Sequence, residues 1–229
     1  MYYQETHQIN SSQFMYKVYG WMSAALAITA GVAFYISTMQ DVVKKLFSSP
    51  GLLIGLFVVQ LGLVIGLSAF ITRLNFAAAM TLFLVYAASV GVTTSAIFLV
   101  YTTTSIYATF LVTAGMFGLM SMYGYFTQTD LTTVGNISIM ALWGIILASL
   151  VNMFFQNAAV DYVISFIGVI VFTALTAYDT QKIKHLASSM IADRETLNKV
   201  AILGALTLYL DFLNLFLLLL RFMGNRRQD

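Results

Sequence analysis

The sequence predicts an all-α membrane protein with seven transmembrane helices. Hydrophobic residues make up 60% of its 229 residues and charged residues only 9%, whereas soluble domains carry about 25% charged residues. Seven apolar runs follow one another, each near the length of about 20 residues that crosses a bilayer. The runs lack the period-two alternation of a transmembrane β-barrel. Helices are therefore favoured, because they satisfy their own backbone hydrogen bonds in lipid.

Polar and turn-forming residues bound the first three runs. The first run, 19–39, stops before the charged stretch 41–45. The second, 51–71, begins directly after Pro50, and proline is favoured in the first turn of a helix. The third, 76–101, stops at a stretch of threonine and serine that separates it from the next run.

The other four runs are bounded in the same way. They cover residues 106–126, 134–155, 160–178 and 200–222. The longest polar segment, 180–199, precedes the last of them. We therefore predict a polar amino-terminal segment over residues 1–18, a seven-helix transmembrane domain over residues 19–222, and a polar carboxy-terminal tail over residues 223–229.

Composition excludes several classes of function. The formal net charge is +2, and the basic residues are scattered at the ends of apolar runs rather than clustered, which argues against a nucleic-acid partner. The absence of cysteine excludes disulfides, thiolate nucleophiles and cysteine-based metal sites. No zinc-protease, phosphate-loop or nucleophile-elbow motif occurs. We expect membrane lipid as a partner, no enzymatic activity and no cofactor.

Orientation is weakly specified by the basic residues. The side of the membrane that holds the amino terminus would carry six basic residues, Lys17, Arg73, Lys182, Lys184, Arg194 and Lys199. The other would hold Lys44, Lys45, Arg221, Arg226 and Arg227. The positive-inside rule favours the first side as cytoplasmic by a margin of one residue. We expect a multi-pass protein with a cytoplasmic amino terminus.

Two acidic residues occur where lipid disfavours charge. Asp211 lies near the centre of the seventh run, and Asp179 closes the sixth. An aspartate at the centre of a transmembrane helix costs about 2.5–3.5 kcal/mol on insertion scales, so it faces the bundle interior or water and marks a candidate functional site. A buried structural hydrogen-bond network is the alternative interpretation.

Helical spacing places each aspartate on a polar stripe. On the seventh run the stripe is Gly204, Thr207, Asp211 and Asn214. On the sixth run it is Ser165, Gly168, Phe172, Thr176 and Asp179. If the stripes face each other, the two carboxyl groups could share one proton. Once both are ionised they would attract a hard cation such as Ca²⁺, which prefers oxygen ligands.

The pairing has a geometric requirement. Asp179 ends its run whereas Asp211 is central, so the two could differ in depth by about 10 Å at 1.5 Å per residue. The difference closes only if the sixth helix continues through Lys182 and Lys184. Arg73, directly after the second run, is the candidate counter-charge, and a snorkelling interfacial arginine is the alternative.

Amides and small residues inside the runs predict helix packing. Asn152 and Gln60 are expected to form helix–helix contacts, with Asn152 as further polar support for the site. Small residues are expected to let helix backbones approach closely. They are Ala24, Ala25, Ala77, Ala78, Ala79, Ala87, Ala88, Gly115 and Gly118.

The chain resembles the Bax inhibitor family (transmembrane Bax-inhibitor-motif proteins), in its bacterial inner-membrane branch. The segments that carry the resemblance are 18–22, 121–125, 130–131, 149–152, 168–184 and 206–216. The resemblance implies six helices around a central seventh, and a pH-sensitive aspartate pair, Asp179 and Asp211, that gates a calcium leak. It also implies an arginine partner at Arg73. The chain departs from the family at 127–131, which lacks a common basic pair.

Three functions remain open from the sequence. The first is a pH-sensitive cation leak, with calcium or protons passing a paired-aspartate site. The second is an interaction protein that binds other membrane proteins and modulates stress responses or membrane proteolysis. The third, an intramembrane aspartyl protease, fits poorly, because Leu-Tyr-Leu precedes Asp211 and the only proline is Pro50.

Overall fold

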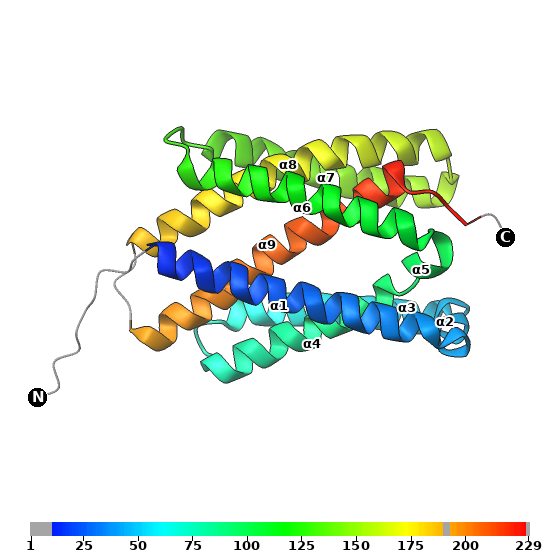
Figure 1. The fold of residues 1–229 in the computed structure, drawn as a ribbon, viewed down its shortest axis with the longest axis horizontal. Helices are drawn as coiled ribbons and strands as arrows, with labels where there is room; N and C mark the ends of the chain where they lie inside the picture. The colour runs from blue at the N-terminus through cyan, green and yellow to red at the C-terminus, as the bar shows by residue number, and fades with distance from the viewer. Residues whose placement is uncertain (1–10, 190–192, 228–229) are drawn as a thin grey trace, which may run out of the picture. The chain divides into compact units, whose positions relative to one another are not determined.

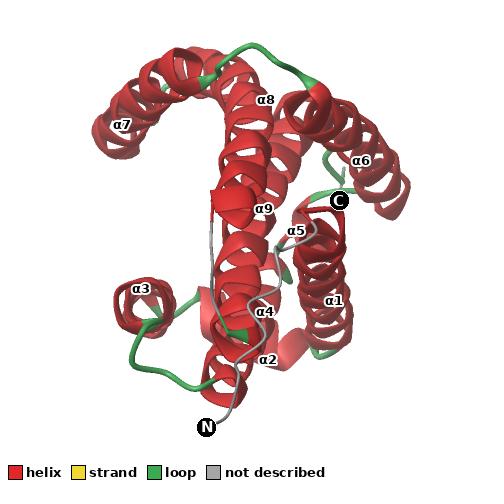
Figure 2. Ribbon diagram, turned by 90° about the vertical axis from the view of Figure 1, so that its left-hand side faces the viewer, coloured by secondary structure: helices red, strands yellow, loops and turns green. Residues whose placement is uncertain are grey.

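The computed structural model describes residues 11–189 and 193–227, and within them the regular secondary structure is helical (Figures 1 and 2). The helices are α1 (Ser11–Thr38), α2 (Gln40–Phe47), α3 (Pro50–Phe70), α4 (Phe76–Thr94), α5 (Ile97–Val100), α6 (Thr103–Phe126), α7 (Thr132–Phe155), α8 (Ala158–Ser189) and α9 (Arg194–Met223). Seven spans in this described part are long and apolar enough to cross a membrane, with α4 and α5 forming one of them. The predicted seven-helix fold class is confirmed, and the protein is a multi-pass membrane protein.

Several helices extend beyond the apolar runs that predict them. α1 begins at Ser11, and α8 continues through the polar residues to Ser189. Polar side chains do not end a helix when no proline or capping residue stops its backbone hydrogen bonds. Caps do set other boundaries: Asn75 Oδ1 accepts a hydrogen bond from Ala78 N at 2.8 Å at the start of α4.

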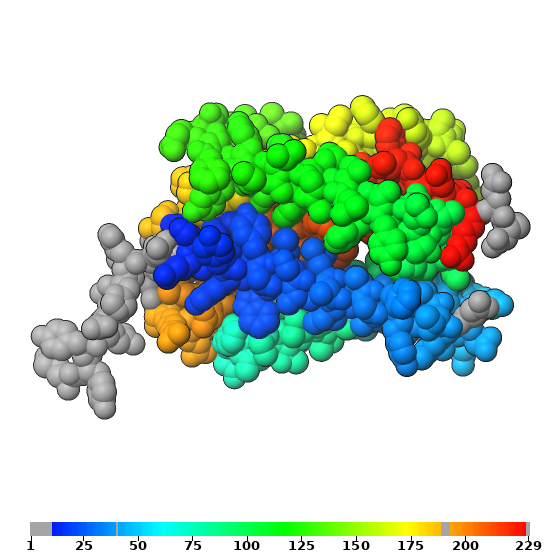
Figure 3. Space-filling view, viewed as in Figure 1, coloured from blue at the N-terminus to red at the C-terminus, as the bar shows by residue number. Residues whose placement is uncertain are grey.

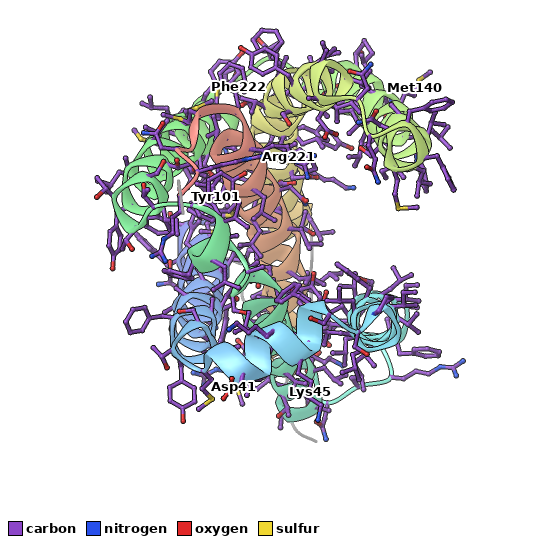
Figure 4. All side chains as sticks on the ribbon, turned by 90° about the vertical axis from the view of Figure 1, so that its right-hand side faces the viewer. Asp41, Lys45, Tyr101, Met140, Arg221 and Phe222 are labelled. Carbon is purple, nitrogen blue, oxygen red and sulfur yellow. The ribbon has the colours of Figure 1, made fainter. Side chains whose placement is uncertain are left out.

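The charged stretch after the first span forms the short helix α2 rather than an irregular break. Val43 on this helix is fully buried, while Asp41, Lys44 and Lys45 are exposed (Figure 4 labels Asp41 and Lys45). Asp41 lies in the first turn and the two lysines in the last. This order complements the helix dipole, which favours acidic residues at the start and basic residues at the end.

The described residues divide into two compact units. The first lies within Met1–Val100 and Leu186–Tyr209, and the second within Tyr101–His185 and Leu210–Asp229. The division passes through α9 between Tyr209 and Leu210. In the most apolar window of α9, 67% of residues are buried, against 11–39% in the other six spans of the described ranges. That share fits a helix shielded from lipid, and the arrangement of six helices around it stays a prediction.

Two consecutive hydrogen bonds, from Tyr209 to Thr29 and from Thr29 to Ala87, lie in the core of the first unit. The Thr29 hydroxyl donates to the Ala87 carbonyl at 2.9 Å. Its proton is thereby used, so the Tyr209 hydroxyl, at 2.6 Å, is the donor to Thr29 Oγ1. The Tyr209 ring is fully buried and meets Phe83 and Tyr86 edge-to-face, with centroids 5.8 and 5.9 Å away. The two bonds link α1, α4 and α9.

We expect Thr29→Val to destabilise the protein by about 1–3 kcal/mol, because the buried Tyr209 hydroxyl loses its acceptor. Thermal unfolding in detergent measures the loss. Thr29→Ser keeps the hydroxyl and serves as the control. Adding Tyr209→Phe to Thr29→Val removes the orphaned donor and should restore most of the loss. Equal stability of Thr29→Val and Thr29→Ser would contradict the assigned bond.

Close helix packing uses other glycines than those expected. A Cβ at Gly115 or Gly118 would meet no atom of the described residues within 4 Å, so the predicted close approach at these two is wrong. At Gly91 a Cβ would lie 2.8 Å from the Thr29 carbonyl oxygen, and at Gly124 it would clash with the Ala177 carbonyl. Among the alanines named above, Ala25, Ala79 and Ala87 are fully buried.

Candidate functional site

Asp179 of α8 and Asp211 of α9 both belong to the second unit, and their carboxyl groups lie close enough to interact with each other. The geometric requirement on this pairing is met, because α8 continues through Lys182 and Lys184 to Ser189. The end of the hydrophobic run at residue 178 is therefore not the end of its helix.

The pair contains one unsatisfied atom. Asp211 is only 5% exposed, and its Oδ2 atom is buried without a hydrogen-bond donor among the described residues. Asp179 is half-buried. A carboxylate cannot donate, so the two groups bond only when one carries a proton. With both ionised, two like charges would face each other in a region of low dielectric constant. Two carboxyl groups placed in this way interact favourably when one of them carries a proton.

The residues after Asp179 attach α8 to its neighbours. The buried Thr180 hydroxyl is 2.8 Å from the Ser121 hydroxyl of α6. Gln181 accepts a hydrogen bond from Leu131 N at 2.9 Å and donates to the Thr129 carbonyl at 2.8 Å. These bonds connect α8 to α6 and to the loop between α6 and α7. The part of α8 next to Asp179 is therefore fixed by hydrogen bonds to α6 and to the loop between α6 and α7.

Two lysines follow on the same helix. Lys184 Nζ donates to the Tyr125 carbonyl in the last turn of α6 at 2.6 Å, and it lies 4.8 Å from the centroid of the Tyr125 ring. This placement suits an ammonium group, because the carboxy end of a helix carries partial negative charge. Lys182 Nζ lies 5.6 Å from the Tyr178 ring centroid.

Sequence reasoning about the site missed Ser121, Thr180 and Gln181 as neighbours of the aspartates. Their partners are 50 to 59 positions away in the chain, so helical spacing cannot connect them. The family resemblance nevertheless indicated which segments contact each other. The segments 121–125, 130–131 and 168–184 carry the family resemblance, and the structure brings residues of all three into contact.

Comparison with known proteins places the chain in a family. Residues 11–228 match the family described as inhibitor of apoptosis-promoting Bax1. The chain belongs to this family. It is 53% identical to inner membrane protein YbhL of Escherichia coli over 215 residues, 93% of this chain and 92% of the relative. A Borreliella burgdorferi protein is 47% identical, covering 95% and 94%. Rickettsia prowazekii protein RP147 is 41% identical, covering 94% and 90%.

The loop between α6 and α7 of this Bax1-inhibitor family member is organised by Asp130. Its Oδ1 atom accepts hydrogen bonds from Thr132 N at 2.9 Å and from the Thr132 hydroxyl at 2.6 Å. These two bonds hold the pKa of Asp130 below its ordinary value. Because the folded state favours the carboxylate form, Asp130 contributes to the stability of the fold. This contribution is complete above the ordinary pKa of aspartate and is lost as pH falls through the lowered pKa of Asp130.

The other predicted site residues lie in different surroundings. Thr207 and Asn214 of α9 donate to carbonyls of their own helix, those of Leu203 at 3.2 Å and Leu210 at 2.8 Å. Arg73 belongs to the first unit, is exposed, and lies 5.9 Å from the Phe70 ring centroid. Its pairing with an aspartate in this family member stays a prediction.

Asn152 organises the turn between α7 and α8. Its Nδ2 atom donates to Asp161 Oδ1 at 2.8 Å and to the Asn157 carbonyl at 3.1 Å. Its Oδ1 atom accepts from Asn157 N at 3.1 Å, beside Gln156 in the left-handed region at φ 50°. Asp161 and Asp179 are about 27 Å apart along α8 at 1.5 Å per residue. Asn152 therefore supports the turn rather than the aspartate pair.

Proposed function

We propose that this protein is a pH-sensitive cation leak of the inner membrane, with its amino terminus in the cytoplasm and without enzymatic activity. Calcium is the favoured ion, and Asp179 and Asp211 are the gate. The observation that carries the proposal is the carboxyl pair of Asp179 and Asp211, in which Asp211 Oδ2 is buried without a donor among the described residues. A pair of neighbouring carboxyl groups changes its charge with proton concentration.

The energy available from the pair is sufficient for gating. A shared proton holds the two carboxyl groups, and with them α8 and α9, together. When it is lost, the two groups repel; as a general scale, two unit charges about 4 Å apart repel by about 4 kcal/mol at an effective dielectric constant of about 20. That energy shifts an equilibrium between two states by roughly a thousand-fold. The ionised pair also offers oxygen ligands to Ca²⁺, which favours the state that admits the ion.

Calcium flux into proteoliposomes across a pH series tests the proposal. We expect flux in the unchanged protein to depend on pH, and Asp179→Asn and Asp211→Asn each to remove that dependence. Asparagine keeps the shape and polarity of the side chain but cannot ionise. The control is Asp161→Asn, because Asp161 is an exposed carboxylate that accepts from Asn152. Unchanged pH-dependent flux in both site variants would exclude the pair as the gate.

A further inference from the structure

A line of buried hydroxyl side chains runs along α6 in the second unit. It consists of Ser105, Thr109, Thr113 and Ser121, at four-residue steps, with Phe117 occupying the one remaining step. Residues four apart are neighbours on a helix surface. From Ser105 to Ser121 the helix rises about 24 Å at 1.5 Å per residue, which is most of the hydrocarbon core of about 30 Å.

Each end of this hydroxyl line has a polar neighbour. The Ser105 hydroxyl accepts a hydrogen bond from Asn225 N at 2.8 Å, after the end of α9. Ser121 bonds to Thr180, the residue next to Asp179. The line therefore extends from the carboxy-terminal segment of the second unit to Thr180, the chain neighbour of Asp179. In the same unit the Oδ2 atom of Asp211 lies buried without a donor among the described residues.

The hydroxyl groups are on the interior face of α6. Thr109 and Thr113 are 1% and 0% exposed, whereas Leu111 and Leu119 are each 70% exposed. Figure 3 shows α6 (green) on the surface of the molecule. The Thr113 hydroxyl donates to the Thr109 carbonyl at 2.8 Å, yet its oxygen keeps acceptor capacity for water or a cation.

Two buried phenylalanines interrupt the line. Phe117 and Phe212 are 5% and 4% exposed, and their rings meet edge-to-face with centroids 5.4 Å apart. Phe110 meets Phe212 on the other side, with centroids 5.5 Å apart. Phe212 directly follows Asp211 on α9. Where an aromatic contact of this kind closes a polar path, it blocks ions because water does not wet it.

We infer that the hydroxyl line of α6 is the path by which a small cation or a proton reaches the aspartate pair, and that the Phe117–Phe212 contact is its closed gate. This inference rests on the proposed leak function and adds its route. Because Phe212 and Asp211 are consecutive residues of one helix, a displacement of α9 that separates the carboxyl groups also separates the rings. Water then connects Thr113 with Ser121.

Cysteine labelling tests the path independently of calcium flux. The chain has no cysteine, so single Thr113→Cys and Leu111→Cys variants can be made directly, each with and without Phe212→Ala. A charged, membrane-impermeant thiosulfonate reacts with the thiolate, which needs water. We expect Phe212→Ala to speed labelling at Thr113→Cys by about tenfold, equivalent to a barrier lower by about 1.4 kcal/mol. Leu111→Cys, facing lipid, should stay unreactive.

The control for the aromatic substitution is Phe166→Ala, because Phe166 is 52% exposed and contacts Phe222 in the same unit. Phe117→Leu is a second gate variant should Phe212→Ala not fold. If Thr113→Cys stays as unreactive as Leu111→Cys in both folded gate variants, the path is wrong, whatever the flux. If labelling follows the expectation but calcium flux is absent, the path stands and the proposed calcium leak fails.

Discussion

We expect Asp211→Asn to raise the unfolding temperature of the protein in mildly alkaline buffer, although it removes the proposed gate. The substitution preserves shape and supplies an amide donor to Asp179. It also removes a carboxylate whose Oδ2 atom is buried without a donor among the described residues. Replacing buried charged groups often stabilises a protein, by about 1–4 kcal/mol. For a chain of this length, that is roughly 3–12 °C.

The matched control for this prediction is again Asp161→Asn. It makes the same chemical change at a carboxyl that is exposed and already hydrogen-bonded by Asn152. We expect its stability to change by less than about 0.5 kcal/mol. Thermal unfolding followed by circular dichroism in detergent measures both variants. A lower unfolding temperature for Asp211→Asn would mean that the native Asp211 carboxylate has a stabilising partner. The conclusion that the two ionised carboxylates repel each other would then be wrong.

The second large effect is expected at Gly124, where α6 and α8 meet. A Cβ at this position would clash with the backbone carbonyl of Ala177, two residues before Asp179. A backbone atom cannot rotate away as a side chain can, so the two helices would have to separate. We expect Gly124→Ala to cost about 3 kcal/mol, the upper end of the usual range for an overpacked core.

The control for Gly124→Ala lies on the same helix. At Gly118 a Cβ meets no described atom within 4 Å, and alanine is the better helix former by about 0.5–1 kcal/mol. Gly118→Ala should therefore be neutral or stabilising. Denaturation in detergent compares the two, and the pH dependence of flux shows whether a shifted α8 still presents Asp179. Equal stability of the two variants would contradict the close approach of α6 and α8.

Hydrophobicity alone was sufficient to predict the seven spans. Runs of about 20 apolar residues have no stable alternative to helices in lipid, because each backbone group must find a partner within its own segment. Asp179 and Asp211 were identifiable for the same reason, since a carboxyl inside such a run stands out against its neighbours. The polar extension of α8 to Ser189 was not predicted, because helix ends depend on capping rather than on hydrophobicity.

The sequence by itself determined the fold class, the membrane location of the chain and its two unusual carboxyl groups. Only the tertiary structure decided what each polar residue contacts. It brought Asp179 close to Asp211, placed Asn152 at the turn before Asp161, and made Gly124 rather than Gly118 the packing glycine. The physical reason is that a sequence pattern relates only residues that are close together in the chain. Helical periodicity relates residues three and four apart, whereas these contacts depend on which faces of separate helices meet.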